Sequence, residues 1–138
     1  MDCPSELPEL RAADHVVVVW KAERLMGLYA SGSLVAKNNE PHCFPIALGD
    51  APAGDKARQG DERTPVGTSR INQKRGMPPR DTALGGDIYL HGGGSVPDDW
   101  TDGCVAVSNE HIDLLYAWAR PGVAVVIVED AEAPLSLR

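Results

Sequence analysis

The sequence lacks an apolar run long enough to cross a bilayer, because its longest runs, residues 16–20 and 123–128, have only the length of β-strands. It also lacks a block of basic residues, since its 13 lysines and arginines are scattered and outnumbered by 20 acidic residues. We therefore expect no membrane span and no nucleic-acid partner. Glycine and proline, at 14 and 11 residues, stay below the level of low-complexity chains, which excludes disorder of the whole chain.

Cysteine is also scarce. Cys3, Cys43 and Cys104 form no CxxC pair, and any single disulfide among them leaves one thiol free. The sequence therefore contains neither a disulfide framework nor a zinc finger. The first residues have neither the basic nor the apolar segment of an export signal, so such a signal is absent or was removed earlier.

The 138 residues fit one domain that buries about two-thirds of its unfolded-chain surface. Segments rich in β-branched residues predict strands over residues 15–21, 24–30, 34–37, 43–48, 67–72, 87–91 and 123–129. Tight turns at residues 22–23 and 31–33 join the first strands into a meander. Two polar stretches rich in glycine and proline, residues 49–64 and 74–86, predict long loops.

One segment has helical periodicity. Ser108 is a good N-cap, and apolar residues on one face follow it until Pro121-Gly122 ends the helix: Ile112, Leu115, Tyr116 and Ala119. Several short strands with a single short helix predict a mainly β protein, either a sandwich or a partly open barrel, because the βα alternation of a doubly wound fold is missing.

The chemistry-bearing residues lie between residues 87 and 107. A strand delivers His91 to its end, a glycine-rich loop follows, and a Thr-Asp-Gly turn presents Cys104 just before the next strand-like run. A thiolate is a strong nucleophile, an imidazole can take its proton, and turn amides can hold an oxyanion. The plainer alternative is a buried structural cysteine beside a hydrogen-bonded structural histidine. Papain-like enzymes place the cysteine before the histidine, so this order does not fit them.

Two motifs resemble one known family. His91-Gly92, followed by Thr101-Asp102-Gly103-Cys104-Val105, resembles the HG…[S/T]-x-G-C-[V/I] signature of the YkuD-type L,D-transpeptidases. Upstream, Leu48-Gly49, Lys56, Gly60-Asp61 and Thr64-Pro65-x-Gly67 resemble that family's "slG…K…GD.rTP.G" segment. The resemblance covers residues 15–128. It implies a mainly β fold, a sandwich of mixed sheets with one short helix after the catalytic cysteine.

The resemblance also implies a function. A catalytic domain over residues 15–130, between an N-terminal extension (1–14) and a C-terminal tail (131–138), would remodel peptidoglycan stem peptides as a cysteine acyltransferase without metal or cofactor. Cys104 would attack the amide after a diamino acid, expel a D-amino acid and pass the acyl group to an amine. Carbapenems would acylate the same sulfur. We expect a monomer in the periplasm or cell envelope, with the cytoplasm as an open alternative.

Roles for single residues follow from the resemblance. His91 would act as general base and acid, the Gly92 carbonyl would hold its tautomer, and the amides of Gly103 and Cys104 would form the oxyanion hole. Candidate substrate-binding residues lie in two groups, one in the upstream loop and one beside the nucleophile: Lys56, Arg63 and Thr64, and Trp100, Thr101 and Asp102. For the first group the alternative is a solvated loop, and for Trp100 and Asp102 it is a packing or structural role.

Three departures from the family pattern leave rival functions open. Asp102 stands where many members have a second histidine, Ala106 where many have arginine or asparagine, and the interval from His91 to Cys104 is short. An L,D-carboxypeptidase or amide hydrolase at the same site is therefore an alternative, and so is a non-catalytic cell-wall-binding module.

Overall fold

The computed structural model describes residues 2–48, 66–71, 74–75, 81–83, 89–91 and 105–135. Within these ranges the chain forms a short 3-10 helix, twelve strands and one α-helix. In chain order they are η1 (Pro8–Leu10), β1 (His15–Trp20), β2 (Leu25–Ala30), β3 (Ser33–Leu34), β4 (Ala36–Lys37), β5 (Glu40–Pro41), β6 (Cys43–Pro45), β7 (Gly67–Arg70), β8 (Lys74–Arg75), β9 (Asp81–Ala83), β10 (Tyr89–His91), β11 (Val105–Ala106), α1 (Asn109–Trp118) and β12 (Ala124–Val128).

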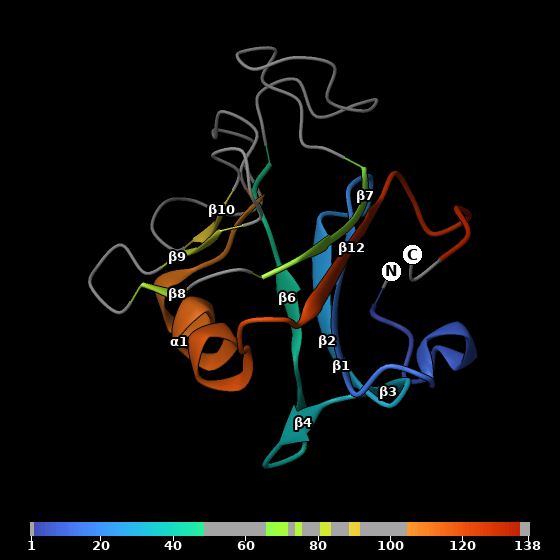
Figure 1. The fold of residues 1–138 in the computed structure, drawn as a ribbon, viewed down its shortest axis with the longest axis horizontal. Helices are drawn as coiled ribbons and strands as arrows, with labels where there is room; N and C mark the ends of the chain where they lie inside the picture. The colour runs from blue at the N-terminus through green and yellow to red at the C-terminus, as the bar shows by residue number, and fades with distance from the viewer. Residues whose placement is uncertain are drawn as a thin grey trace.

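A mixed sheet in the order β3-β2-β1-β12-β7 forms the centre of the fold, with β6 also paired to β2 (Figure 1). β1 and β2 form an antiparallel hairpin in which Trp20 pairs with Leu25. β12 returns from the far end of the chain and pairs in parallel with β1, and β7 pairs antiparallel with β12. The expected hairpin is confirmed, and the parallel pair makes the sheet mixed.

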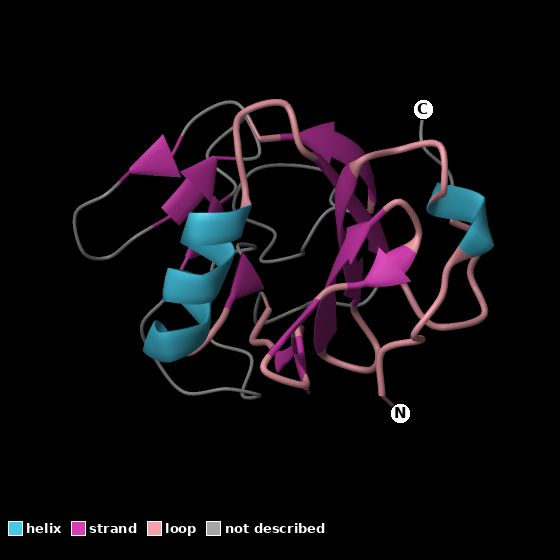
Figure 2. Cartoon of the chain, turned by 90° about the horizontal axis from the view of Figure 1, so that it is seen from below, coloured by secondary structure: helices cyan, strands magenta, loops and turns pink. Residues whose placement is uncertain are grey.

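Both faces of this sheet are buried. Along β1, Val17 and Val19 belong to one apolar cluster, whereas Val16 and Val18 belong to another. Successive side chains of a strand point to opposite faces, so the two clusters cover the two sides of the sheet. Figure 2 shows α1 on one side and the 3-10 helix on the other. Burial on both faces explains why β1 and β12 are continuous apolar runs.

The first face is covered by a smaller sheet in the order β11-β10-β9-β8 and by α1. Ser108 caps the helix as expected, because its hydroxyl accepts a hydrogen bond from the amide of His111 at 3.4 Å. Ile112 and Leu115 bury the helix face against the sheet. Burying one such side chain fully contributes about 1.5–3 kcal/mol, so this helix is held by packing more than by its intrinsic propensity.

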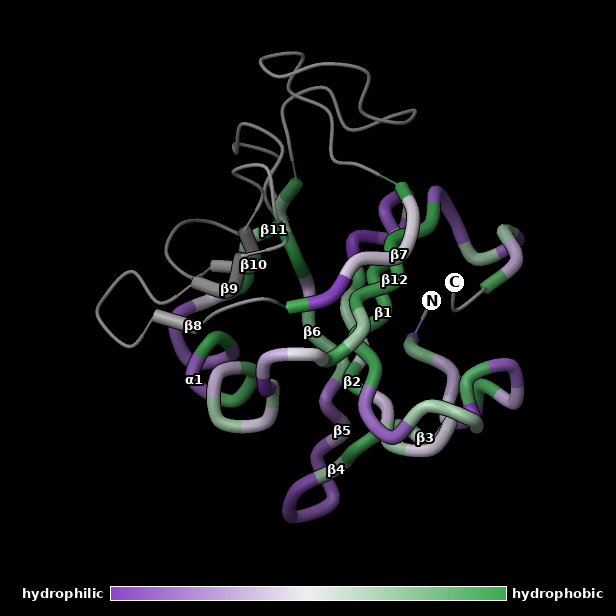
Figure 3. The backbone as a smooth tube through the Cα atoms, in the orientation of Figure 1, coloured by the Kyte–Doolittle hydropathy of each residue, from purple (hydrophilic) through white to green (hydrophobic). Residues whose placement is uncertain are grey.

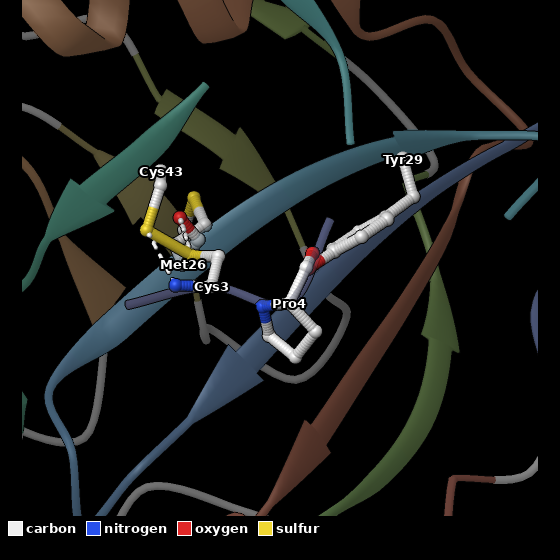
Figure 4. Close-up of a disulfide and its surroundings, with 5 residues drawn as sticks. All are labelled: Cys3, Pro4, Met26, Tyr29 and Cys43. Atoms are coloured by element: carbon white, nitrogen blue, oxygen red, sulfur yellow. Dashed lines mark hydrogen bonds between the residues drawn. A yellow bond between two sulfur atoms is a disulfide. The ribbon is translucent and has the colours of Figure 1, made fainter. Parts of the chain in front are cut away.

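The second face is covered by the N-terminal segment, whose Leu7 and Leu10 are buried. A disulfide joins Cys3 to Cys43 of β6, with Cα atoms 5.8 Å apart (Figure 4). The amide of Cys3 also donates to the Cys43 sulfur at 3.2 Å. Close by, the Tyr29 hydroxyl donates to the Pro4 carbonyl at 2.6 Å, and burial raises the pKa of Tyr29 above its ordinary value. The segment is thus attached to the sheet covalently, by packing and by a hydrogen bond.

β4 and β5 form a small hairpin that leaves the sheet. Its turn residues, Asn38 and Asn39, both have positive φ, at 53° and 65°. This is the conformation of a two-residue primed turn, which asparagine tolerates better than most residues. Figure 3 shows this hairpin as a hydrophilic projection. The predicted strand over residues 34–37 is therefore wrong in part, because Leu34 ends β3 in the large sheet while Ala36 begins β4 in the hairpin.

The predicted fold class is confirmed: the protein is mainly β, with mixed sheets and one α-helix after residue 104. The expectation of an uninterrupted loop over residues 74–86 is wrong, since β8 and β9 lie within it and pair with each other. No helix in the described ranges combines the length and the apolarity that crossing a membrane would need.

Candidate active site

His91 is the last residue of β10, as predicted. The other candidate site residues lie outside the described residues: Cys104, Gly92, Gly103, Lys56, Arg63, Thr64, Trp100, Thr101 and Asp102. The structure does describe the two strands that flank residues 92–104. They are β10, which leads into the glycine-rich loop, and β11, which begins one residue after Cys104.

β10 and β11 lie side by side in parallel, with Leu90 opposite Val105 and His91 opposite Ala106. Two segments that are fourteen residues apart in the sequence, 91 and 105, are thus brought to neighbouring strands. Neighbouring strands are about 4.8 Å apart, so the end of β10 and the start of β11 are close in space. The topology therefore brings His91 beside the strand that follows Cys104 in the sequence.

β11 is fixed on its other edge as well. Ala47, which follows β6, exchanges two backbone hydrogen bonds with Ala106, at 2.8 and 2.9 Å. Val105 and Ala106 have no exposed surface. A side chain as long as arginine at position 106 would have to displace core atoms, which is consistent with alanine there. The strand after Cys104 is accordingly held on both edges within the core.

The cysteines divide into two kinds. Cys3 and Cys43 form the disulfide on the second face of the sheet, so neither of them has a free thiol. The sequence has three cysteines, and Cys104 is the third. The pairing could not be inferred from the sequence, which left open which of the three stays free.

A second group of polar residues lies beside α1, around a cavity of about 190 Å³ lined by His42, Phe44 and His111 among others. The rings of Phe44 and His111 stack with centroids 4.4 Å apart. His111 is half-buried although it lies in the first turn of α1. Its Nδ1 is buried without a hydrogen-bond partner among the residues that the structure describes.

We expect His42 to make the stability of this region depend on pH. Burial lowers its pKa, the positive charges of Lys37 and His111 lower it further, and a hydrogen bond with the Glu40 backbone opposes the shift. A histidine whose pKa is lowered by folding binds protons more readily in the unfolded state. The free energy of unfolding therefore falls as the pH drops below the ordinary histidine value of about 6.5.

We expect the melting temperature to fall between pH 7.5 and pH 5.5, and His42→Gln to reduce that fall. Thermal denaturation followed by circular dichroism at the two pH values measures both. The matched control is His15→Gln, which removes a histidine that does not line this cavity. An equal pH dependence in wild type and His42→Gln would show that His42 does not cause it.

A family model for the L,D-transpeptidase catalytic domain, YkuD, matches residues 14–128. This match runs from the start of β1 to the end of β12 and includes the strands that flank the candidate site. The chain belongs to the L,D-transpeptidase catalytic domain family. A comparison with curated protein sequences gives no match.

Solved structures of a cell-shape-determining protein and of L,D-transpeptidases have the same fold. The cell-shape-determining protein Pgp2 of Campylobacter jejuni is 23% identical, with a TM-score of 0.69, and the match covers 89% of this chain and 50% of that one. L,D-transpeptidase 3 of Mycobacterium tuberculosis, solved with a faropenem-derived adduct, is 16% identical, with a TM-score of 0.65 and coverages of 84% and 60%. An L,D-transpeptidase of Xylanimonas cellulosilytica is 21% identical, with a TM-score of 0.63 and coverages of 83% and 60%. This chain spans between half and three fifths of the length of those chains.

Within the described residues, no group of three or more histidine, cysteine, aspartate or glutamate side chains could hold a metal ion.

Proposed function

We propose that the protein is a cysteine acyltransferase of the L,D-transpeptidase type that acts on peptidoglycan stem peptides through Cys104. The observation that carries the proposal is the parallel pairing of β10 and β11, which sets the end of the strand bearing His91 beside the start of the strand that follows Cys104. Val105 pairs with Leu90, and Cys104 directly precedes Val105 in the chain. The Cα atoms of Cys104 and Val105 are therefore about 3.8 Å apart.

The proposed reaction has two steps. The Cys104 sulfur, whose proton passes to His91, attacks the carbonyl of the amide after the diamino acid of a stem peptide. The C–N bond breaks, His91 returns the proton to the leaving nitrogen, and a D-amino acid departs. An acceptor amine then attacks the thioester carbonyl and loses a proton to His91. The C–S bond breaks, the new amide is released, and His91 returns the proton to the Cys104 sulfur. The Gly103 and Cys104 amides hold the oxyanion, and the Gly92 carbonyl orients His91.

Substrate contacts in the proposal come from the two groups predicted in the sequence. Lys56, Arg63 and Thr64 would hold carboxylates of the stem peptide, where arginine can form two parallel hydrogen bonds. Trp100, Thr101 and Asp102 would flank the nucleophile. Ala106 is buried in the core and faces His91 across the strand pair, so the carboxylate contacts must come from elsewhere.

The disulfide supports a location outside the cytoplasm. Structural disulfides persist in oxidising compartments such as the bacterial periplasm and are rare in the cytosol, where thiols are kept reduced. The Cys3–Cys43 bond attaches buried chain to the sheet and takes no part in the proposed chemistry. We therefore place the protein in the periplasm or cell envelope, acting there as a monomer.

The direct test of the function is product analysis. We expect purified protein incubated with a defined tetrapeptide muropeptide and an acceptor to yield the crosslinked dimer and free D-amino acid, detected by mass spectrometry. Release of the D-amino acid without a crosslinked product would show that the enzyme hydrolyses the substrate and does not transfer the acyl group. No change in either substrate, with a correctly folded protein, would refute catalysis and leave the cell-wall-binding module.

A further inference from the structure

A second cavity, of about 500 Å³, lies at the other end of α1 from β11. It is formed where three segments meet: the chain entering β1, the end of β7 and the turn between α1 and β12. The ten residues of α1 span about 15 Å, and they separate this cavity from the strand that follows Cys104. Within the described residues, the cavity is therefore separate from the strand that follows Cys104.

The wall of the cavity is held in place by backbone hydrogen bonds. The Gly122 amide donates to the Ile71 carbonyl at 2.7 Å, and the Ile71 amide donates to the Val123 carbonyl at 2.9 Å. Gly122 has a φ of 97°, which other residues rarely adopt, so glycine sets the shape of this turn. On the other side, His15 stacks on Trp118 with ring centroids 4.6 Å apart. The turn and the start of β1 are thus fixed before any ligand binds.

Among the described residues, two cations and one anion line this cavity: Arg70, Arg120 and Asp14. The Arg70 guanidinium is positioned by one hydrogen bond, from Nη1 to the Gly122 carbonyl at 2.9 Å. A guanidinium has five N–H donors, so most of those on Arg70 are not used by that bond. In a chain with a formal charge of −7, two arginines at one cavity indicate an anionic group as the ligand, and a carboxylate fits their planar donors.

The carboxylate of Asp14 indicates which class of anionic ligand the cavity favours. Its side chain is 85% exposed and lies 3.5 Å from Nδ1 of His15. A ligand of negative charge only, such as a phosphate polymer, would be repelled by this carboxylate. A ligand that also carries an ammonium group would be attracted by it. The combination of two guanidiniums with one carboxylate therefore favours a zwitterion.

We propose that this cavity binds the head group of a free α-amino acid, with Arg70 and Arg120 holding its carboxylate and Asp14 its ammonium group. The remaining walls, which include Ala12, Ala13 and Pro121, accept a small apolar side chain. The site is argued independently of the proposed function, because none of the described residues that line it belongs to the candidate active site.

The test is a titration of ¹⁵N-labelled protein with D-alanine, followed by amide chemical shifts. We expect saturable shifts in the millimolar range at His15, Gly122 and Val123, with L-alanine as a second arm that reports chirality. N-acetyl-D-alanine lacks the ammonium group and D-alaninamide lacks the carboxylate, so each should bind at least ten-fold more weakly. Equal binding of N-acetyl-D-alanine would overturn the zwitterion site in favour of a simple anion site.

Variants locate the binding in the cavity. Arg120→Gln and Asp14→Asn should each weaken D-alanine binding at least ten-fold, whereas Lys37→Gln, a matched loss of charge on the β4–β5 hairpin, should leave it unchanged. All three positions are exposed, so the fold should tolerate the changes. Shifts confined to residues of β10 and β11, or unchanged binding in both cavity variants, would refute the proposal. Acylation of Cys104 by a lactam, measured separately, reports on the proposed function alone.

Discussion

Cys104→Ala should abolish acylation and turnover completely while leaving the melting temperature within about 1 °C of wild type. The reason is chemical, because alanine has no nucleophile and nothing else in the proposed mechanism can form the acyl-enzyme. Losing a nucleophile of this kind lowers kcat by at least about 10³-fold in well-studied hydrolases. A carbapenem gives a direct measurement, since opening its strained lactam leaves the acyl group on the sulfur. L,D-transpeptidase 3 of Mycobacterium tuberculosis, which has the same fold, has been solved with a faropenem-derived adduct.

The measurement is intact-protein mass spectrometry after incubation with a carbapenem. Wild type should gain the mass of one inhibitor and Cys104→Ala none. The control is the double variant Cys3→Ala/Cys43→Ala, which should still gain one adduct below its melting temperature, because Cys104 is the remaining thiol. Equal labelling of wild type and Cys104→Ala would show that another residue reacts and that the nucleophile is misassigned.

The strands of the large sheet could be predicted from the sequence because their burial is uniform. β1 and β12 are apolar on both faces, and the turn residues between β1, β2 and β3 are those that tight turns require. The hairpin of β4 and β5 was missed although Asn38-Asn39 is a recognisable turn signal. The short strands β8 and β9 gave no signal, because two or three residues are too few to establish a period of two.

The candidate site divides in the same way. A histidine at a strand end and a cysteine before the next strand are local features, and the structure confirms the strands β10 and β11 on either side of them. Their parallel pairing is a long-range fact that no local pattern encodes. The cavity with Arg70, Arg120 and Asp14 was missed for the same reason, since its residues come from three separate parts of the chain.

The disulfide was beyond the sequence as well, because three cysteines allow three single pairings and their spacing favours none. The structure selects Cys3 and Cys43, which are 40 residues apart and lie on the buried second face. Cys3 is buried beside Tyr29, whose hydroxyl contacts Pro4, so the bond attaches a segment that also covers core. Loss of the disulfide should therefore destabilise the whole sheet.

We expect reduction of this disulfide, or the double variant Cys3→Ala/Cys43→Ala, to destabilise the protein by about 4 kcal/mol. Cross-linking residues 40 apart removes that much chain entropy from the unfolded state in the loop-closure model. For a domain of this size the corresponding loss in melting temperature is about 10–15 °C. Alanine is the better replacement, because Cys3 is only 8% exposed and a serine hydroxyl there would need a partner.

Differential scanning calorimetry with and without dithiothreitol measures the effect. Oxidised wild type should melt well above reduced wild type, and the double variant should melt near the reduced protein regardless of reductant. Cys104→Ala separates the two roles of cysteine, since it should keep the full response to reductant although it has lost the proposed nucleophile. If oxidised and reduced wild type melted at the same temperature, the bond between Cys3 and Cys43 would not stabilise the fold, and the support that it gives to a location in an oxidising compartment would be lost.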